Sequence, residues 1–389
     1  MSYLSLSLEA MVLQDKTFLL LSLVADAVDF PAHIVTLYGM SNSETLERLE
    51  AFWNRSSLGR PALRVVVAPA EDEAEQPYTG PWPDDLLQRD LCPDYHRHRT
   101  QQAARRTHCL AEAMPGHHLW WGSLLTTLPV LAGGEYEYHD SAWIKEIDDI
   151  LTRALPNFDP NSPAAKMLER AYLAARDGCP KDQFITPPLM LDGLSTLGMF
   201  RGFENLCTDL IDRPEWVKTW SARLTDMYIA IYEHYYRLLG YGRSQCFGGP
   251  TTPGRCEGVQ CDFAVHFSPA MFEEFTLPDL RRTTEYLDRS LYHLDGTCQL
   301  RFLDQLRACP RLNGIQWNPE TTALEPLKWL HAFREMRRRD FCIMIGATVD
   351  DAIEITKQIG PDGLFFCLPA FKTQDEALQA IERFEKLMV

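Results

Sequence analysis

The segment at residues 290–317, "SLYHLDGTCQLRFLDQLRACPRLNGIQW", contains a short apolar run, an amphipathic stretch and a second apolar run. The apolar runs lack the polar alternation of a half-exposed strand, and this favours strands that are covered on both faces, as in parallel sheets. The stretch between them has the length and spacing of a helix. A strand, a helix and a second strand in this order predict one βαβ unit with parallel strands.

The same unit repeats to the C-terminus, where helices and strands alternate. The expected helices lie at 270–289, 300–309, 326–340, 349–360 and 373–389, and the expected strands at 290–294, 312–317, 341–347 and 363–369. No glycine-rich nucleotide-binding pattern follows any of the strands. We therefore expect a (β/α)₈ TIM barrel over residues 56–389, with residues 1–55 as an N-terminal extension.

Composition and charge restrict the class of protein. The 389 residues are 46% hydrophobic and 24% charged, with a formal net charge of −16. This acidity argues against a nucleic-acid binder, which normally carries a basic face. The eleven cysteines include no C-x-x-C pair, which indicates reduced thiols and a cytoplasmic location. The most apolar N-terminal run, residues 17–30, contains two aspartates and is shorter than the roughly 20 residues that span a bilayer, so we expect no membrane contact.

Chemically reactive side chains stand where the expected strands end. In a TIM barrel the active site forms at the C-terminal ends of the strands. His293 and Asp295 are two residues apart, so in a strand they face the same side. The other candidates at strand ends are Asp262, His266, Gln316, Trp317, Glu320 and Cys367. Trp121, which follows another tryptophan and precedes a glycine, is typical of a pocket wall or of an aromatic packing cluster.

Three stretches carry a resemblance to a known family: "HFSPAMFEEFTLPDLRRTTEYL", "YHLDG" and "LNGIQWNPE". They resemble the uroporphyrinogen decarboxylase superfamily, which also contains corrinoid-linked methyltransferases and the barrel domains of cobalamin-independent methionine synthase. The resemblance implies a (β/α)₈ barrel with its site at the C-terminal face. The basic run at 96–108 differs from the arginine motif of the decarboxylases. The zinc methyltransferases carry a His-x-Cys pair where this chain has His293-x-Asp295, and Cys367 is the cysteine near the last strand.

The resemblance leaves three functions open. In the first, His293, Asp295 and Cys367 bind Zn²⁺ or another divalent metal, and the protein transfers a methyl group to or from a small substrate, with the corrinoid carried by a partner protein. In the second, a metal-free decarboxylase acts on a pyrrolic or aromatic carboxylic acid, and His293 or His266 donates the proton. In the third, the barrel binds a tetrapyrrole or another small ligand without catalysis.

These functions also give expected roles to the remaining candidate residues. Asp262 is expected beside the catalytic pair, and Trp121, Gln316, Trp317 and Glu320 are expected to contact the substrate. A structural alternative also stands: Asp295 caps the following helix and His293 is a hydrogen-bonded core histidine. Related folds commonly form homodimers, so a homodimer is a further possibility for this chain.

Overall fold

The computed structural model describes residues 42–70, 73–122, 126–139, 141–320 and 324–388. Residues 1–41, most of the expected N-terminal extension, lie outside the described residues. The compact unit begins at Ser43. Helix α2 (Asn42–Trp53) belongs to it, because Leu49, Phe52 and Trp53 are fully buried. The unit therefore starts before the expected boundary at residue 56.

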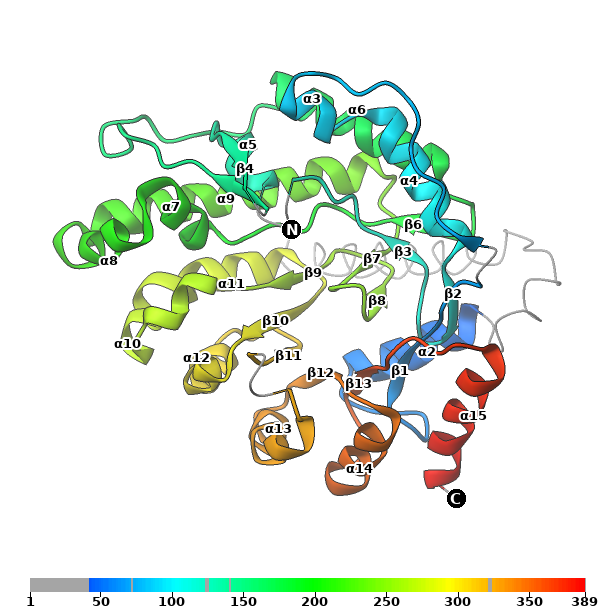
Figure 1. Cartoon of the computed structure of the whole chain (residues 1–389). Helices are drawn as coiled ribbons and strands as arrows, with labels where there is room; N and C mark the ends of the chain where they lie inside the picture. Colours follow the sequence, from blue (N-terminus) through cyan, green and yellow to red (C-terminus); the bar gives the residue numbers. More distant parts are fainter. Residues whose placement is uncertain (1–41, 71–72, 123–125, 140, 321–323, 389) are drawn as a thin grey trace, which may run out of the picture. The chain divides into compact units, whose positions relative to one another are not determined.

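A seven-stranded sheet forms the centre of this unit (Figure 1). Its strand order is β2-β1-β13-β12-β11-β10-β9, and every neighbouring pair is parallel except β1 with β2. The strands are β1 (Ala62–Val67), β2 (His108–Ala111), β9 (Cys256–Val259), β10 (Arg289–Asp295), β11 (Gly314–Asn318), β12 (Cys342–Gly346) and β13 (Leu364–Cys367). The parallel strands predicted between residues 290 and 369 are thus confirmed.

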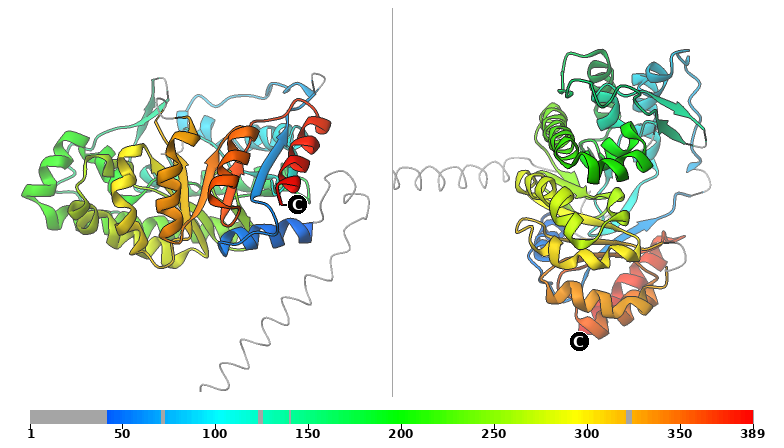
Figure 2. Two further views of the ribbon diagram at one scale, coloured as in Figure 1. Left: turned by 90° about the horizontal axis from the view of Figure 1, so that it is seen from below. Right: turned by 90° about the vertical axis from the view of Figure 1, so that its left-hand side faces the viewer.

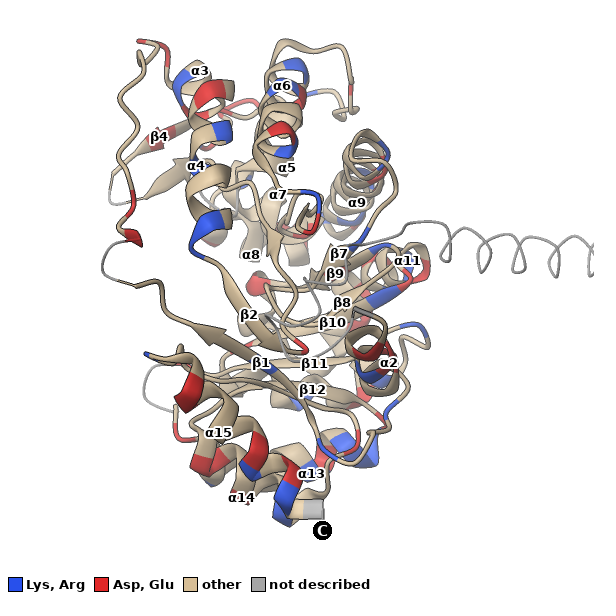
Figure 3. Cartoon of the chain, turned by 90° about the vertical axis from the view of Figure 1, so that its right-hand side faces the viewer, with Lys and Arg blue, Asp and Glu red and all other residues tan. Residues whose placement is uncertain are grey.

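Helices connect successive parallel strands, and they carry charged residues of both signs (Figure 3). In the C-terminal half these are α10 (Pro269–Met271), α11 (Leu277–Tyr286), α12 (Leu303–Arg307), α13 (Leu330–Arg338), α14 (Val349–Ile359) and α15 (Gln374–Glu385). Hydroxyl caps begin several of them, as at Thr348, which accepts a hydrogen bond from the Asp351 amide. The N-terminal half contributes α3 (Leu86–Asp90), α4 (Pro93–Arg105), α5 (Thr127–Leu131), α6 (Pro163–Gly178), α7 (Gly193–Arg201), α8 (Phe203–Asp212) and α9 (Pro214–Leu238). None of the described helices has the length and apolar character that a bilayer crossing requires.

The main sheet does not close into the expected eight-stranded barrel within the described residues. The remaining strands are short and pair separately: β3 (Gly116–His117) with β6 (Phe184–Ile185), β4 (Tyr136–Tyr138) with β5 (Ala142–Ile144), and β7 (Ser244–Gln245) with β8 (Thr251–Thr252). Prolines at 115, 187 and 188 flank β3 and β6, and proline cannot donate to a strand ladder. The Gln245 side chain partly bridges the gap, since its Nε2 donates to the Met114 carbonyl at 3.1 Å.

Helix α2 packs across the end of the sheet where the parallel strands begin (Figure 2). Its buried side chains join Ala62, Leu291 and Phe365 in one apolar cluster, although these three residues lie on separate strands. The Cys342 thiol, at the first residue of β12, donates to the Phe52 carbonyl at 3.0 Å. The sheet therefore curves around this cluster. Further along the same strands, other inward-facing side chains lie near the C-terminal strand ends.

Candidate active site

His293 and Asp295 face the same side of β10 and contact the neighbouring strand. His293 is in register with Gln316 and Asp295 with Asn318 on β11. The His293 Nδ1 lies 2.6 Å from the Gln316 Oε1, and the Asn318 Nδ2 donates to the Asp295 Oδ1 at 2.9 Å. Gln316 shares its row with Met344 of the inner cluster. The predicted common orientation of His293 and Asp295 is thus present.

These hydrogen bonds determine which nitrogen of His293 is free to react. Because the Gln316 carbonyl oxygen can only accept, the Nδ1 of His293 carries the proton in the neutral ring. The Nε2 then carries the lone pair, 3.9 Å from the Asp295 Oδ1 and 3.4 Å from the Asn318 amide nitrogen. Gln316 therefore orients the imidazole, and the basic Nε2 faces Asp295 and Asn318.

Asp262 adds a second carboxyl group with a perturbed pKa. It begins the short 3₁₀ turn Asp262–His266 after β9. Its Oδ1 is buried and has no hydrogen-bond partner among the described residues. Burial raises the pKa of Asp262 to about 6, the nearby His293 opposes the rise, and Asp295 adds to it. Near neutral pH both its protonated and its ionised form are populated, as a general acid or base requires. We call Asp262, His293, Asp295, Gln316 and Asn318 the strand-end cluster.

Phe247 covers His293, and sequence reasoning missed it. Its ring centroid lies 5.1 Å from that of His293. Its φ of 49° lies in the left-handed region that non-glycine residues rarely adopt, and such strained residues often occur at functional sites. A Cβ atom on Gly258 would lie 1.8 Å from the Phe247 ring, so a glycine at this strand position makes room for the ring. The feature of the sequence that could have pointed to Phe247 is the glycine-rich turn "CFGGP".

Arg64 is a second residue that sequence reasoning missed. It lies two positions after the inward-facing Ala62 on β1, in register with Cys367, so it faces the inside of the sheet at the strand ends. It is half-buried, and within the described part of the chain no carboxylate forms an ion pair with it. A lone arginine in the apolar strand "ALRVVV" was the available signal. An unpaired guanidinium here can bind an anionic group of a ligand.

Among the described residues, His293, Asp295 and Cys367 are not grouped as a set of metal ligands. Cys367 lies on β13, which β11 and β12 separate from β10. Burial raises the pKa of the Cys367 thiol to about 12, although Arg64 opposes the rise, so the thiol is protonated near neutrality. No group of three His, Cys, Asp or Glu side chains within the described ranges is arranged to hold a metal ion. These residues therefore do not fit the three-ligand site of a catalytic zinc.

Trp317 faces the helices and not the inside of the sheet, which corrects the expected contact with substrate. It is buried against Trp329 and Phe333 of the α13 segment. Side chains alternate along a strand, so Trp317 lies opposite to Gln316 and Asn318. Trp317 is a core residue of the outer layer.

Glu320, expected to contact the substrate, instead takes the capping role that the structural alternative gave to Asp295. Both oxygens of Glu320 are used by Thr297, whose amide and hydroxyl donate to them at 2.7 and 2.6 Å. These bonds lower the pKa of Glu320. The residue before the 3₁₀ turn Thr297–Phe302 is Gly296, with no side-chain cap. Glu320 therefore holds the start of this turn, and Asp295 is not its cap.

Two further candidates lie apart from the strand-end cluster. His266 is exposed at the far end of its turn, where its ring packs edge-on against Phe263. Trp121 is buried in the wall of a different cleft, near α3, α4 and β4.

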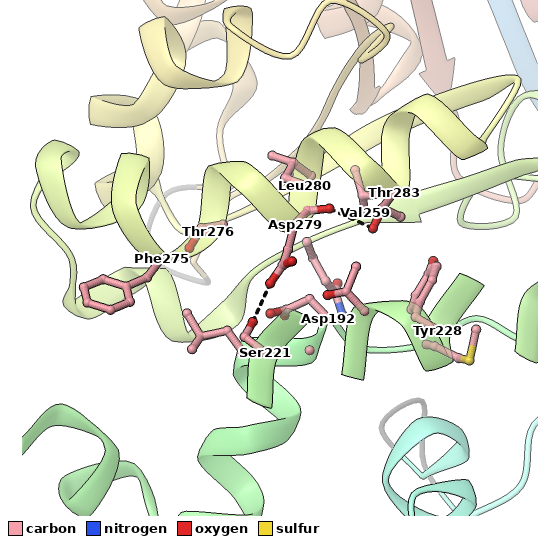
Figure 4. Close-up of a pocket in the computed structure, with 14 residues that line it drawn as sticks. Asp192, Ser221, Tyr228, Val259, Phe275, Thr276, Asp279, Leu280 and Thr283 are labelled. Carbon is pink, nitrogen blue, oxygen red and sulfur yellow. Dashed lines mark hydrogen bonds between the residues drawn. The ribbon is translucent and has the colours of Figure 1, made fainter. Parts of the chain in front are cut away.

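A small pocket lies between α7, α9 and α11 (Figure 4). Asp192 caps α7 through the Ser195 amide, and its other oxygen is buried without a partner among the described residues. Burial raises the pKa of Asp192 to about 7, and the nearby Asp262 adds to the rise. The Ser221 hydroxyl donates to Asp279 at 2.7 Å across the same pocket. No member of the strand-end cluster lines this pocket, which belongs to the helix layer.

Comparison with known proteins supports the fold. No protein-family model matches the sequence, and no curated protein matches it. A methyltransferase from Methanosarcina mazei is similar in structure, with a TM-score of 0.54 and 12% sequence identity over 88% of this chain and 98% of that chain. At this identity the likeness shows a shared α/β architecture with a mainly parallel sheet.

Proposed function

We propose that this protein is an enzyme that transfers a methyl group to or from a small anionic molecule at the strand-end cluster. The observation that carries the proposal is the grouping of His293, Asp295 and Asp262 at the C-terminal strand ends. Arg64, which has no ion-pair partner among the described residues, lies on the same inner face of the sheet. The structural likeness to a methyltransferase favours this reaction among those that such a cluster can serve.

Each of these residues has a role in the proposed reaction. Arg64 binds the anionic group of the acceptor and orients it. His293 Nε2 or the Asp262 carboxylate takes the proton from an acceptor thiol or hydroxyl. The resulting anion forms a bond to the methyl carbon, and the bond between methyl and donor breaks with its electron pair remaining on the donor. A corrinoid held by a partner protein would supply the methyl carrier, and Asp295 stabilises the His293 cation after proton transfer.

A metal-free decarboxylase is the second candidate. It is favoured by the raised pKa of the Asp262 carboxyl group and by Arg64, which lies on the inner face of the same sheet. In that reaction Arg64 would bind a second carboxylate, CO₂ would leave, and protonated Asp262 would donate a proton to the carbon.

An anaerobic assay distinguishes the two. Purified protein is incubated with methylcobalamin and 3-mercaptopropionate, and the methyl thioether is measured by NMR. Pyrrole-2-carboxylate is tested in parallel for CO₂ release. Methyl thioether formed above the rate without protein supports methyl transfer. CO₂ release without thioether supports decarboxylation and contradicts our first proposal, and metal analysis of the same sample reports whether zinc is present in stoichiometric amount.

Arg64→Gln is expected to raise KM for 3-mercaptopropionate about tenfold with a smaller change in kcat, because one charge-assisted hydrogen bond to the anion is lost. The uncharged thiol 2-mercaptoethanol is the matched substrate, and its KM should not change. An equal loss with both thiols would contradict the role of Arg64 in anion binding.

The pH dependence of methyl transfer follows from Asp262. Its pKa is raised to about 6, and a base acts only when ionised, so kcat/KM is expected to fall as the pH drops through about 6. Asp262→Asn should remove this limb of the profile together with most of the activity. Activity that instead falls as the pH rises through 6 would assign Asp262 as an acid, as in the decarboxylase.

A further inference from the structure

A larger cleft lies between α3, α4, the segment after β3 and strand β4. Its volume is about 930 Å³, at the upper end of the roughly 300–1,000 Å³ typical of small-molecule sites. We call it the aromatic cleft, and its characteristic lining residues are Trp82, Tyr95, Arg99, Trp120, Trp121 and Tyr138. It shares no lining residue with the strand-end cluster.

The rings around the aromatic cleft are unusually exposed for their size. Trp82 is 47% exposed, Trp120 41% and Tyr138 40%. Trp82 is held in place by Tyr95, with ring centroids 4.9 Å apart. Large exposed rings that gather around a hollow indicate a binding surface, and flat rings favour a flat ligand that stacks on them.

In the aromatic cleft, the half-buried charged group that has no ion-pair partner among the described residues is a cation. Asp90 is already used, because it accepts hydrogen bonds from the hydroxyls of Tyr136 and Tyr138, each at 2.8 Å, and pairs with Arg89 at 3.6 Å. Arg99 is half-buried, and its Nη1 donates to the Trp120 carbonyl at 3.0 Å. No carboxylate among the described residues forms an ion pair with Arg99.

A cationic ligand would face two arginines in this cleft and would have only one unused carboxylate, that of Asp84. Asp84 is exposed at the rim, where solvent and salt screen its charge. A carboxylate, in contrast, can bind the free edge of the Arg99 guanidinium through two parallel hydrogen bonds. The observations therefore favour a ligand that is flat on one side and anionic at one end.

We infer that the aromatic cleft binds an aromatic carboxylic acid, with its ring against Trp120 and its carboxylate on Arg99. This site is independent of the proposed methyl transfer, because it uses none of the residues assigned to that reaction.

Isothermal titration of the full chain with benzoate tests the inference. We expect saturable binding that weakens at least about tenfold in Arg99→Gln and also weakens in Trp120→Ala, which keeps the backbone carbonyl that Arg99 uses. Arg105→Gln is the matched control, since Arg105 is an exposed arginine on the same helix, and it should bind benzoate like the wild type. Arg64→Gln should retain the benzoate binding that Arg99→Gln loses, which separates this cleft from the strand-end cluster. Melting temperatures verify that each variant is folded.

Two further probes test the chemical class. Cyclohexanecarboxylate keeps the charge but not the flat ring, and benzyltrimethylammonium keeps the ring but reverses the charge. Both should bind more weakly than benzoate. The inference is overturned if benzoate does not bind saturably, if Arg99→Gln leaves its affinity unchanged, if Arg64→Gln abolishes binding, or if either probe binds as tightly as benzoate.

Discussion

His293→Ala is expected to lower kcat/KM for methyl transfer by at least about 100-fold, the usual contribution of a positioned acid or base. The reason is local: the Gln316 oxygen fixes the proton on Nδ1, so of the two ring nitrogens it is Nε2 that can take a proton from the acceptor. The measurement is the initial rate with methylcobalamin and 3-mercaptopropionate, for wild type and variant at several pH values.

His266→Ala is the matched control for this variant. Both histidines follow strands and both are candidates from the sequence, but His266 is exposed and packs on Phe263. We expect His266→Ala to retain most of the activity. Similar losses in the two variants would show that the strand-end cluster does not determine the rate.

Glu112→Ala is expected to lower the free energy of unfolding by roughly 3–5 kcal/mol, because it removes one partner of a buried ion pair. Glu112 is completely buried, and Arg60 donates to both of its oxygens at 2.8 and 3.0 Å. The Leu63 amide on β1 donates to the same carboxylate at 2.7 Å. This carboxylate therefore ties the segment after β2 to β1. Urea denaturation monitored by tryptophan fluorescence gives the value.

Glu335→Ala is the control for this second prediction. Glu335 also pairs with arginines, Arg338 and Arg339, but its side chain is partly exposed on α13. Exposed ion pairs contribute little to stability because solvent screens them, so we expect only a small change. If Glu112→Ala cost no more than Glu335→Ala, the buried pair would not be a stabilising connection in this fold.

The parallel strands and their helices could be predicted because the signals are local. Each apolar run between residues 290 and 369 is followed by a helix with one apolar face, and the structure confirms this alternation. The common orientation of His293 and Asp295 also followed from the two-residue period of a strand. The same period predicts that Trp317 points away from Gln316, and applying it there would have excluded Trp317 from the site.

Features that depend on distant parts of the chain could not be predicted. The separation of Cys367 from His293 depends on strand order and curvature, which no short stretch encodes. The main sheet stays open where β3 and β6, of two residues each and flanked by prolines, pair separately from it. The contact of Gln245 with Met114, which partly bridges this gap, joins residues far apart in the sequence. Arg64 was visible as one charge in an apolar strand, but its place on the inner face beside Cys367 required the pairing of β1 with β13.

The most direct test of the account is histidine-ring NMR of selectively ¹⁵N-labelled protein, with the His293 signals assigned from a His293→Gln spectrum. We predict that the neutral form of the ring is protonated on Nδ1, and that its Nε2 signal changes when 3-mercaptopropionate is added. A ring protonated on Nε2, or His293 signals that do not respond at saturating thiol while the substrate is turned over, would contradict the placement of the reaction at the strand-end cluster.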